Sequence, residues 1–292
     1  MKRNNLFCAL GFACALISCK KDEGVTATYD DTPYTLQLIN NTLPEPNLPE
    51  DNPLTVQKVE LGRMLFYEPM LSQDGSISCA SCHIQSDGFS DKNQFSEGVG
   101  GSLGKRQAMP VFNLAWHSNG FFWDGRAELL RHQALLPIQD ELEMKETLAN
   151  VTAKLAGSLD YRNQFVRAFG EDIVSSDKIA LALEAFMFSI VSDDSKYDRY
   201  LKGLEELTES EDRGRELFFA EYNPFFPDVS GADCAHCHSG SNFENDLYMN
   251  NGLDVTADLT DIGYEAVTED PADKGKFKVP SLRNIAVTQP YM

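Results

Sequence analysis

The sequence predicts a mainly α-helical protein of two domains with long loops. Apolar residues recur at three- and four-residue intervals in several segments, whereas the strict alternation typical of strands is scarce. Two copies of one cysteine-histidine motif, at residues 79–83 and 234–238, stand far apart in a chain of 292 residues, a length that suits two domains of ordinary size.

The first element that we expect is an export signal. Two basic residues precede an apolar stretch from Leu6 to Ile17, which is too short to span a membrane as a helix. Residues 16–19 (LISC) resemble a bacterial lipobox, in which the signal peptide, here residues 1–18, is cleaved before the cysteine. Acylation of Cys19 would then anchor an exported periplasmic or outer-membrane lipoprotein. An ordinary signal peptide with an incidental cysteine is the alternative.

The next segments are a tether and the first helix of the folded body. Residues 19–51 are polar and interrupted by prolines, which predicts a tether. Residues 56–66 carry apolar side chains at helical spacing, and a helix should end there because Pro69 disfavours helix at the preceding residue.

Two later segments also predict helices. An apolar stripe begins after residues 176–177 and consists of Ile179, Leu183, Phe186 and Ile190. Thr208 and Glu211 have the spacing of a capping box, which predicts the start of another helix. We place the domain boundary between these two helices, which gives domains over residues 52–203 and 204–292.

The motifs CASCH at residues 79–83 and CAHCH at residues 234–238 have the spacing of c-type haem attachment. Two thiols at this spacing can each form a thioether with a haem vinyl group, and the next imidazole then lies beneath the iron. We therefore predict two cytochrome c-like haem domains with long haem-wrapping loops and two covalently bound haem c groups. The predicted attachment and axial residues are Cys79, Cys82 and His83 for one haem, and Cys234, Cys237 and His238 for the other.

Other uses of these cysteines agree less well with the sequence. A structural zinc site and a thioredoxin-like dithiol are the alternatives, but neither requires a histidine directly after the second cysteine. Cys8 and Cys14 lie in the expected signal peptide, so no cysteine remains for a disulfide. The formal net charge of −20 argues against nucleic acid as a partner and favours a basic docking protein, although acidity also serves solubility alone.

Four further motifs surround the two attachment sites. They are LGRMLF at residues 61–66, FFWDGRA at 121–127, PIQDELEM at 137–144 and PSLRNIA at 280–286. From about Pro53 onward the chain resembles the bacterial dihaem cytochrome c peroxidase family. The resemblance implies reduction of hydrogen peroxide with electrons from a small cytochrome c or cupredoxin, contact with a membrane only through the lipid anchor, and compatibility with a homodimer.

The resemblance also implies roles for single residues. His83 would hold the peroxidatic haem and His238 the electron-transferring haem. Trp123 matches a tryptophan between the haems, Glu143 a distal acid–base carboxylate, and Gln133 a distal glutamine. From the residues alone, an ordinary core aromatic next to a turn is the alternative for Trp123, and one of several carboxylates at an acidic helix start is the preferred interpretation of Glu143.

Two histidines and one valine bear on access to the first iron. Val99 stands where members that need reductive activation carry a capping histidine, so we expect the His83 haem to be open when ferric. His117 and His132 are expected to be polar surface or pocket residues rather than iron ligands.

In its second half, the sequence departs from the pattern of the family. The family's distal methionine would lie beyond Met292, so we expect a fragment that lacks the usual ligand. Met249 could replace that ligand only if its loop folded over the haem, and an ordinary apolar contact is the favoured alternative.

The resemblance further suggests a calcium ion between the domains. Family members use backbone carbonyls that map to Thr288 and Pro290, together with an asparagine in whose place Gln107 stands. Two rival functions stay open at this stage: a dihaem electron-transfer protein without catalysis, and a dihaem oxidase that matures a quinone cofactor in a partner protein.

Overall fold

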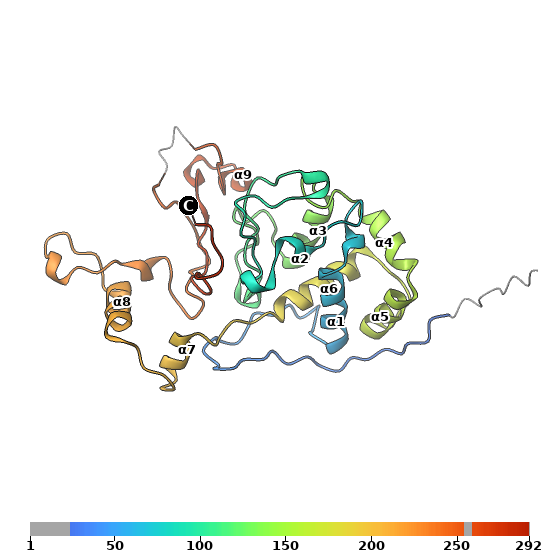
Figure 1. The fold of residues 1–292 in the computed structure, drawn as a ribbon, viewed down its shortest axis with the longest axis horizontal. Helices are drawn as coiled ribbons and strands as arrows, with labels where there is room; N and C mark the ends of the chain where they lie inside the picture. The colour runs from blue at the N-terminus through green and yellow to red at the C-terminus, as the bar shows by residue number, and fades with distance from the viewer. Residues whose placement is uncertain (1–23, 254–258, 292) are drawn as a thin grey trace, which may run out of the picture.

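The structure, a computed structural model, describes residues 24–253 and 259–291 and is mainly helical, as predicted (Figure 1). The helices are α1 (Val56–Phe66), α2 (Cys79–Cys82), α3 (Leu130–Gln139), α4 (Leu148–Ala156), α5 (Leu159–Phe169), α6 (Ser176–Phe188), α7 (Lys196–Leu201), α8 (Glu209–Phe219) and α9 (Glu265–Thr268). The strands β1 (Tyr248–Met249) and β2 (Phe277–Lys278) pair antiparallel. The expected signal peptide, Cys19 and Met292 lie outside the described residues.

The core lies where α1 crosses α6, with α3, α4 and α5 around them (Figure 1). Thr55 caps α1 by accepting the amide of Lys58, and the helix ends at Phe66 as predicted. A Cβ added at Gly62 would lie 1.9 Å from the carbonyl oxygen of Ala182, so glycine is needed for the two helices to approach. The predicted capping box of Thr208 and Glu211 is present at the start of α8.

The segment that we expected as a tether lies extended along the body in the part described, residues 24–51 (Figure 1). Its backbone hydrogen bonds go to the body: Asp193 accepts the amide of Asn40 over 3.0 Å, and Trp116 donates to the carbonyl of Pro44 over 2.7 Å. Proline prevents helix formation here, but it does not prevent such contacts, because they use the neighbouring amides and the carbonyl oxygens.

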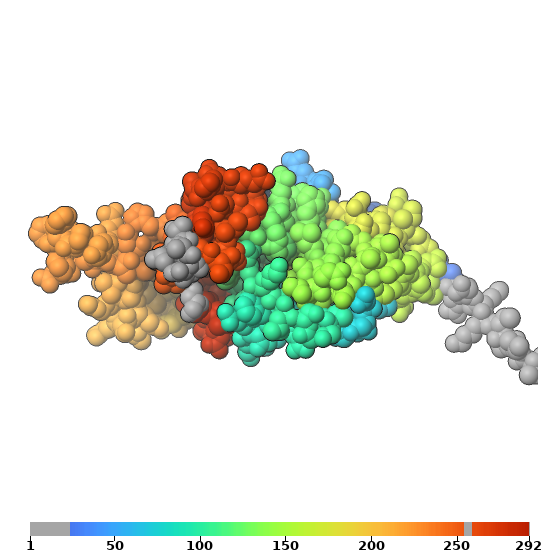
Figure 2. Space-filling model, turned by 90° about the horizontal axis from the view of Figure 1, so that it is seen from above, coloured from blue at the N-terminus to red at the C-terminus, as the bar shows by residue number. Residues whose placement is uncertain are grey.

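We call residues 24–203 the first lobe and the described residues from 204 onward the second lobe. The second lobe projects from the end of the molecule opposite residue 24 (Figures 1 and 2). Several ion pairs join the lobes, and two of them involve arginine side chains that reach across the joint. Arg283 binds Asp198 through two bonds of 2.7 and 2.8 Å, and Arg106 binds Asp261 at 2.7 Å. Within the described residues, no helix has the length and apolar character needed to cross a membrane.

Candidate functional site

The first cysteine-histidine motif is presented by a short helix. Ser78 and Ser81 form a capping box at the start of α2, and the amide of His83 donates to the carbonyl of Cys79 over 2.9 Å. Nδ1 of His83 lies 3.0 Å from the carbonyl oxygen of Phe89, which leaves Nε2 as the nitrogen available to a metal. Burial lowers the pKa of His83 and favours the neutral imidazole that metal ligation requires.

A cavity of about 940 Å³ lies beside this motif. Its wall includes Cys82 and His83 as well as the three side chains to which the resemblance gave roles, Trp123, Gln133 and Glu143. The second lobe closes one side of the cavity with residues 260–262 and Lys278. The donor set, the paired thiols and the size of the cavity fit a haem bound at residues 79–83.

Glu143 lies in a turn between α3 and α4, not at a helix start. The helix α4 begins later, at Leu148, and is capped by Thr147. The interpretation of Glu143 as a helix-start carboxylate is therefore wrong, because the chain turns toward the cavity before the helix forms. Burial raises the pKa of Glu143, Asp140 adds to the rise, and Arg126 opposes it.

The α3 helix separates two neighbouring polar side chains. Gln133 faces the cavity, whereas His132 is exposed on another side of the helix. His132 is therefore a surface residue, in agreement with the expectation.

The loop at Val99 packs against the turn at Glu143. The amide of Val99 donates to the carbonyl oxygen of Glu143 over 2.9 Å. A Cβ at Gly98 would lie 2.0 Å from the carbonyl oxygen of Leu142, so the loop can approach this closely only with glycine at that position. Val99 is buried and does not belong to the wall of the cavity, although Glu97 and Gly98 do.

A smaller hollow of about 320 Å³ adjoins the main cavity. Both are lined by Phe122, Arg126, Pro137, Asp140 and Glu143. The guanidinium carbon of Arg126 lies 3.5 Å from the centre of the Phe122 ring, and the guanidinium is partly exposed. The hollow therefore gives a route from the surface to the Glu143 carboxylate.

Trp123 lies at the joint of the two lobes. Its carbonyl oxygen accepts the amide of Lys278 over 2.7 Å, and its ring packs edge-on against Phe277 with 6.1 Å between centroids. These surroundings are compatible with both interpretations of Trp123, as a core aromatic and as a tryptophan between the two haems.

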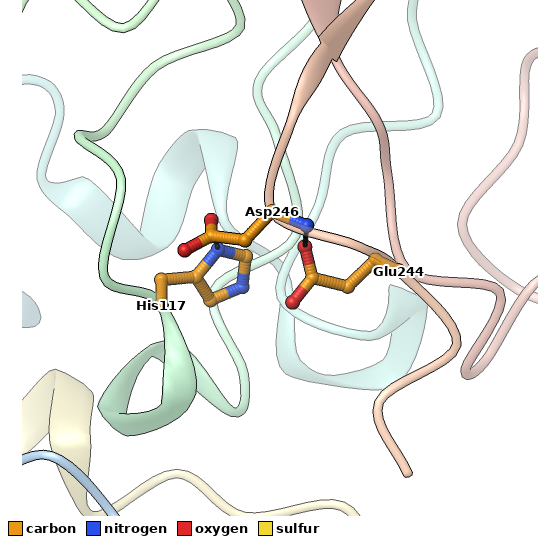
Figure 3. Close-up of side chains that lie close together, drawn as sticks. All are labelled: His117, Glu244 and Asp246. Carbon is orange, nitrogen blue, oxygen red and sulfur yellow. Dashed lines mark hydrogen bonds and ion pairs between the residues drawn. The ribbon is translucent and has the colours of Figure 1, made fainter. Parts of the chain in front are cut away.

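His117 belongs to an ionic group that the sequence analysis missed. Nδ1 of His117 lies 3.5 Å from Asp246, and Figure 3 shows its ring between the carboxylates of Asp246 and Glu244. The ligand atoms of these three residues lie within 4.8 Å of one another, as in a metal site, but the ammonium of Lys278 already pairs with Asp246. Residues more than a hundred positions apart form this group, and no spacing signal reveals it.

The second cysteine-histidine motif lies in the second lobe. Nδ1 of His238 lies 3.2 Å from the carbonyl oxygen of Phe243 and 3.1 Å from that of Pro280, which again leaves Nε2 available. The sulfur of Met249 lies 3.3 Å from the sulfur of Cys237. That contact places Met249 next to an attachment cysteine, and the interpretation of Met249 as an ordinary apolar neighbour stays a prediction.

The residues suggested for calcium come together between the lobes. The amide nitrogen of Gln107 donates to the carbonyl of Asp91 over 2.6 Å and to that of Gln289 over 3.1 Å. Gln289 lies between Thr288 and Pro290, so the side chain reaches the predicted segment. A calcium ligand would need the amide oxygen on this side, which a flip of the amide supplies.

Comparison with known proteins gives consistent matches. A family model described as di-haem cytochrome c peroxidase matches residues 56–206. The methylamine utilization protein MauG of Methylophilus methylotrophus is 36% identical over 84% of this chain and 70% of its own length. The cytochrome c551 peroxidase of Pseudomonas aeruginosa is 35% identical over 82% of this chain and 68% of its own length.

Solved structures agree with these matches. The crystal structure of a MauG-like protein associated with microbial copper homeostasis has a TM-score of 0.78 and 34% identity, and the match covers 86% of this chain and 76% of that one. The diheme peroxidase BthA from Burkholderia thailandensis has a TM-score of 0.69 at 22% identity, covering 92% of this chain and 77% of that one, and so shares the fold.

Proposed function

The chain belongs to the di-haem cytochrome c peroxidase family, as an oxidoreductase with two c-type haems, and from that premise we propose that it reduces hydrogen peroxide to water. The observation that carries the proposal is the position of Glu143. A half-buried carboxylate with a raised pKa lines both the large cavity beside His83 and the hollow that leads to the surface. Such a group can transfer protons inside a site that is otherwise shielded from water.

The reaction consumes two electrons and two protons for each peroxide and yields two waters. Haem, when bound at residues 79–83, supplies the iron chemistry of this reduction. Glu143 takes the proton from one peroxide oxygen and returns it to the other as the bond between them breaks. Gln133 faces the same space and can donate a hydrogen bond that orients the peroxide.

Cys234, Cys237 and His238 would hold the haem that takes electrons from the donor, and Cys79, Cys82 and His83 would hold the haem that receives them. In this proposal Trp123, at the joint of the lobes, lies on the route between the two sites. The contact of Trp123 with Lys278 and Phe277 of the second lobe supports this route.

We infer that the electron donor docks on an aromatic loop formed by residues 222–229. Phe225 and Phe226 are 84% and 65% exposed, and the side chain of Asn223 holds the loop by accepting both of their amides. Acidic side chains outnumber basic ones in the surrounding residues 204–233. An apolar centre with an acidic rim fits a small basic redox protein, whereas a second copy of this acidic chain would bring like charges together.

The lipid anchor is a further proposal. Acylation of Cys19 would attach the exported chain to a membrane through its lipid chains alone. Replacing Cys19 with Ala should abolish lipid labelling and membrane fractionation. Labelling that survives the change would refute the lipoprotein assignment.

Steady-state turnover tests the peroxidase proposal directly. The haem-loaded full chain is mixed with a reduced basic cytochrome c, and oxidation of the cytochrome is followed as hydrogen peroxide is added. We expect two cytochromes oxidised for each peroxide consumed. A chain with both haems in place that oxidises the donor no faster than free haem would contradict the proposal, and would favour an electron-transfer protein without catalysis.

A partner-protein oxidase is the second candidate. It is favoured by the 36% identity to MauG and the fold match at 34% identity to a MauG-like protein. Oxidation of residues in a partner protein when peroxide is added without an external donor would distinguish this activity from peroxide removal.

A further inference from the structure

A buried ion pair of the second lobe binds the first lobe through hydrogen bonds. Asp246 of the second lobe accepts the main-chain amide and the hydroxyl of Ser118 over 2.6 and 2.8 Å. The ammonium of Lys278 pairs with the same carboxylate and donates to the carbonyl of Asn119 over 3.0 Å. The side chain of Lys278 is 3% exposed, so the ion pair lies in an environment of low dielectric constant. The attraction between opposite charges is stronger there than in water. We call Ser118, Asn119, Asp246 and Lys278 the interlobe clamp.

The clamp also holds Trp123. The main-chain amide of Lys278 donates to the carbonyl oxygen of Trp123 over 2.7 Å, and the preceding residue, Phe277, packs edge-on against the indole. One residue of β2 therefore fixes Trp123 with its backbone and residues 118–119 with its side chain. The segment that carries Trp123 is held at two points about five residues apart in the sequence.

The remaining charged groups around the clamp agree with an ion pair rather than a metal site. His117 of the first lobe and Glu244 of the second lobe flank Asp246 (Figure 3). Glu244 accepts the amide of Asp246 over 3.1 Å and so orients its main chain. The hydrogen bond from His117 and the pairing with Lys278 outweigh the effect of burial and lower the pKa of Asp246, so its carboxylate stays charged.

We propose that Lys278 and Asp246 are positioning residues for electron transfer between the two haem sites, because they fix Trp123 relative to the second lobe. The proposal rests on the proposed route of electrons past Trp123. Electron transfer through a side chain depends on where that side chain lies between the two sites, so a displacement of Trp123 should slow the transfer.

The first experiment is the variant Lys278→Met in the haem-loaded full chain. It removes the ammonium while the amide of residue 278 and a similar apolar stem remain. We expect the electron to pass from the His238 haem to the His83 haem at least about ten-fold more slowly, as measured by rapid mixing with a one-electron reductant. Lys276→Met is the matched control, since Lys276 precedes the same strand and its ammonium pairs, among the described residues, with Asp273 at 2.9 Å.

A structural readout separates positioning from simple damage. The chain has two tryptophans, so labelling with 5-fluorotryptophan gives two ¹⁹F resonances. The Trp123 line should move in Lys278→Met and return toward its position in Lys278→Arg, which keeps the charge. The line of Trp116, which donates to Pro44 instead, should stay nearly unchanged.

Two further results decide the proposal. Asp246→Asn should slow the same electron-transfer step, and it serves as the test if Lys278→Met does not fold. The proposal would be refuted by a folded variant that transfers electrons between the haems at the wild-type rate and in which the ¹⁹F resonance of Trp123 has not moved. Absence of peroxide turnover in the wild-type chain would refute the proposed function alone, because electron transfer between the haems is measured without peroxide.

Discussion

The main-chain amide of Val99 donates to the carbonyl oxygen of Glu143 over 2.9 Å, so the loop at residues 97–103 is fastened to the turn that carries the proposed acid–base carboxylate. The bond turns Val99 away from the cavity, and the side chain is buried elsewhere. This contact ties the main chain of Glu143 to the loop beside the first haem site.

Glu143→Gln should lower peroxide turnover by roughly 10²–10⁴-fold, the usual contribution of a general acid–base group. Haem content and the affinity for small ligands at the first site should be unchanged, because glutamine has nearly the same shape. Glu141→Gln is the matched control, since the Glu141 side chain is 80% exposed in the same turn. Equal peroxide turnover in the two variants would contradict the acid–base role of Glu143.

The pH dependence of kcat/KM for peroxide should show an acid limb set by Glu143. The carboxylate accepts a proton only when ionised, so activity falls as the pH drops through its pKa, which burial and Asp140 raise above the ordinary value. Asp140→Asn should move the limb to lower pH. Arg126→Met should move it to higher pH, and shifts in the same direction for both variants would contradict this electrostatic account.

The first haem site should accept peroxide without prior reduction. Val99 cannot ligate iron and does not line the cavity, and the described histidines His117 and His132 lie outside the cavity wall. The fully ferric protein should therefore bind cyanide promptly and show no lag in turnover. A low-spin spectrum typical of two histidine ligands at the His83 haem would disprove this, and His117→Ala would then be the first variant to examine.

The double variant Phe225→Ser/Phe226→Ser should raise the KM for a basic cytochrome donor by about ten-fold, equivalent to about 1.4 kcal/mol of binding. The KM for peroxide and the thermal stability should not change, because both rings are exposed. Ile173→Ser replaces another exposed apolar residue, in the first lobe, and serves as the control. A loss of stability in the double variant would mean that the rings pack within the folded protein.

Arg283→Met should destabilise the protein by about 3–5 kcal/mol, because it leaves the carboxylate of Asp198 buried without its partner. Burial alone would raise the pKa of Asp198, but hydrogen bonds from Arg283, Ser195 and Thr42 outweigh it and hold the pKa well below its usual range.

That depressed pKa also fixes how stability depends on pH. The folded state gains from the ionised carboxylate above the ordinary value of 3.8 and loses this gain as the pH falls below it. Urea unfolding at several pH values should show the loss in the wild type and a weaker one in Arg283→Met. Arg215→Met, at an exposed pair with Asp212, should change the stability far less than Arg283→Met.

Local signals in the sequence were sufficient for much of the fold. The helix that ends at Phe66 and the capping box of Thr208 and Glu211 depend only on side chains and amides within a few residues of each other. The two haem motifs are equally local, since the cysteines and the histidine that would hold each haem lie within five positions of the sequence.

The tertiary structure decided the features that join distant segments. Residues 24–51 lie against the body because groups such as Asp193 and Trp116 supply hydrogen bonds to them, and no property of that segment alone predicts this. Glu143 and a helix-start carboxylate are indistinguishable in the sequence. Only the turn after α3 brings Glu143 into the cavity beside His83.

The interlobe clamp shows most clearly the difference between what the sequence determined and what the tertiary structure decided. The sequence by itself determined the helices and the two attachment motifs, because their stabilising contacts are short-range. Trp123 of the first lobe meets Lys278 and its partner Asp246 of the second lobe only when the two lobes pack, because these residues are far apart along the chain. The relation between the two haem sites was therefore decided by the packing of the lobes.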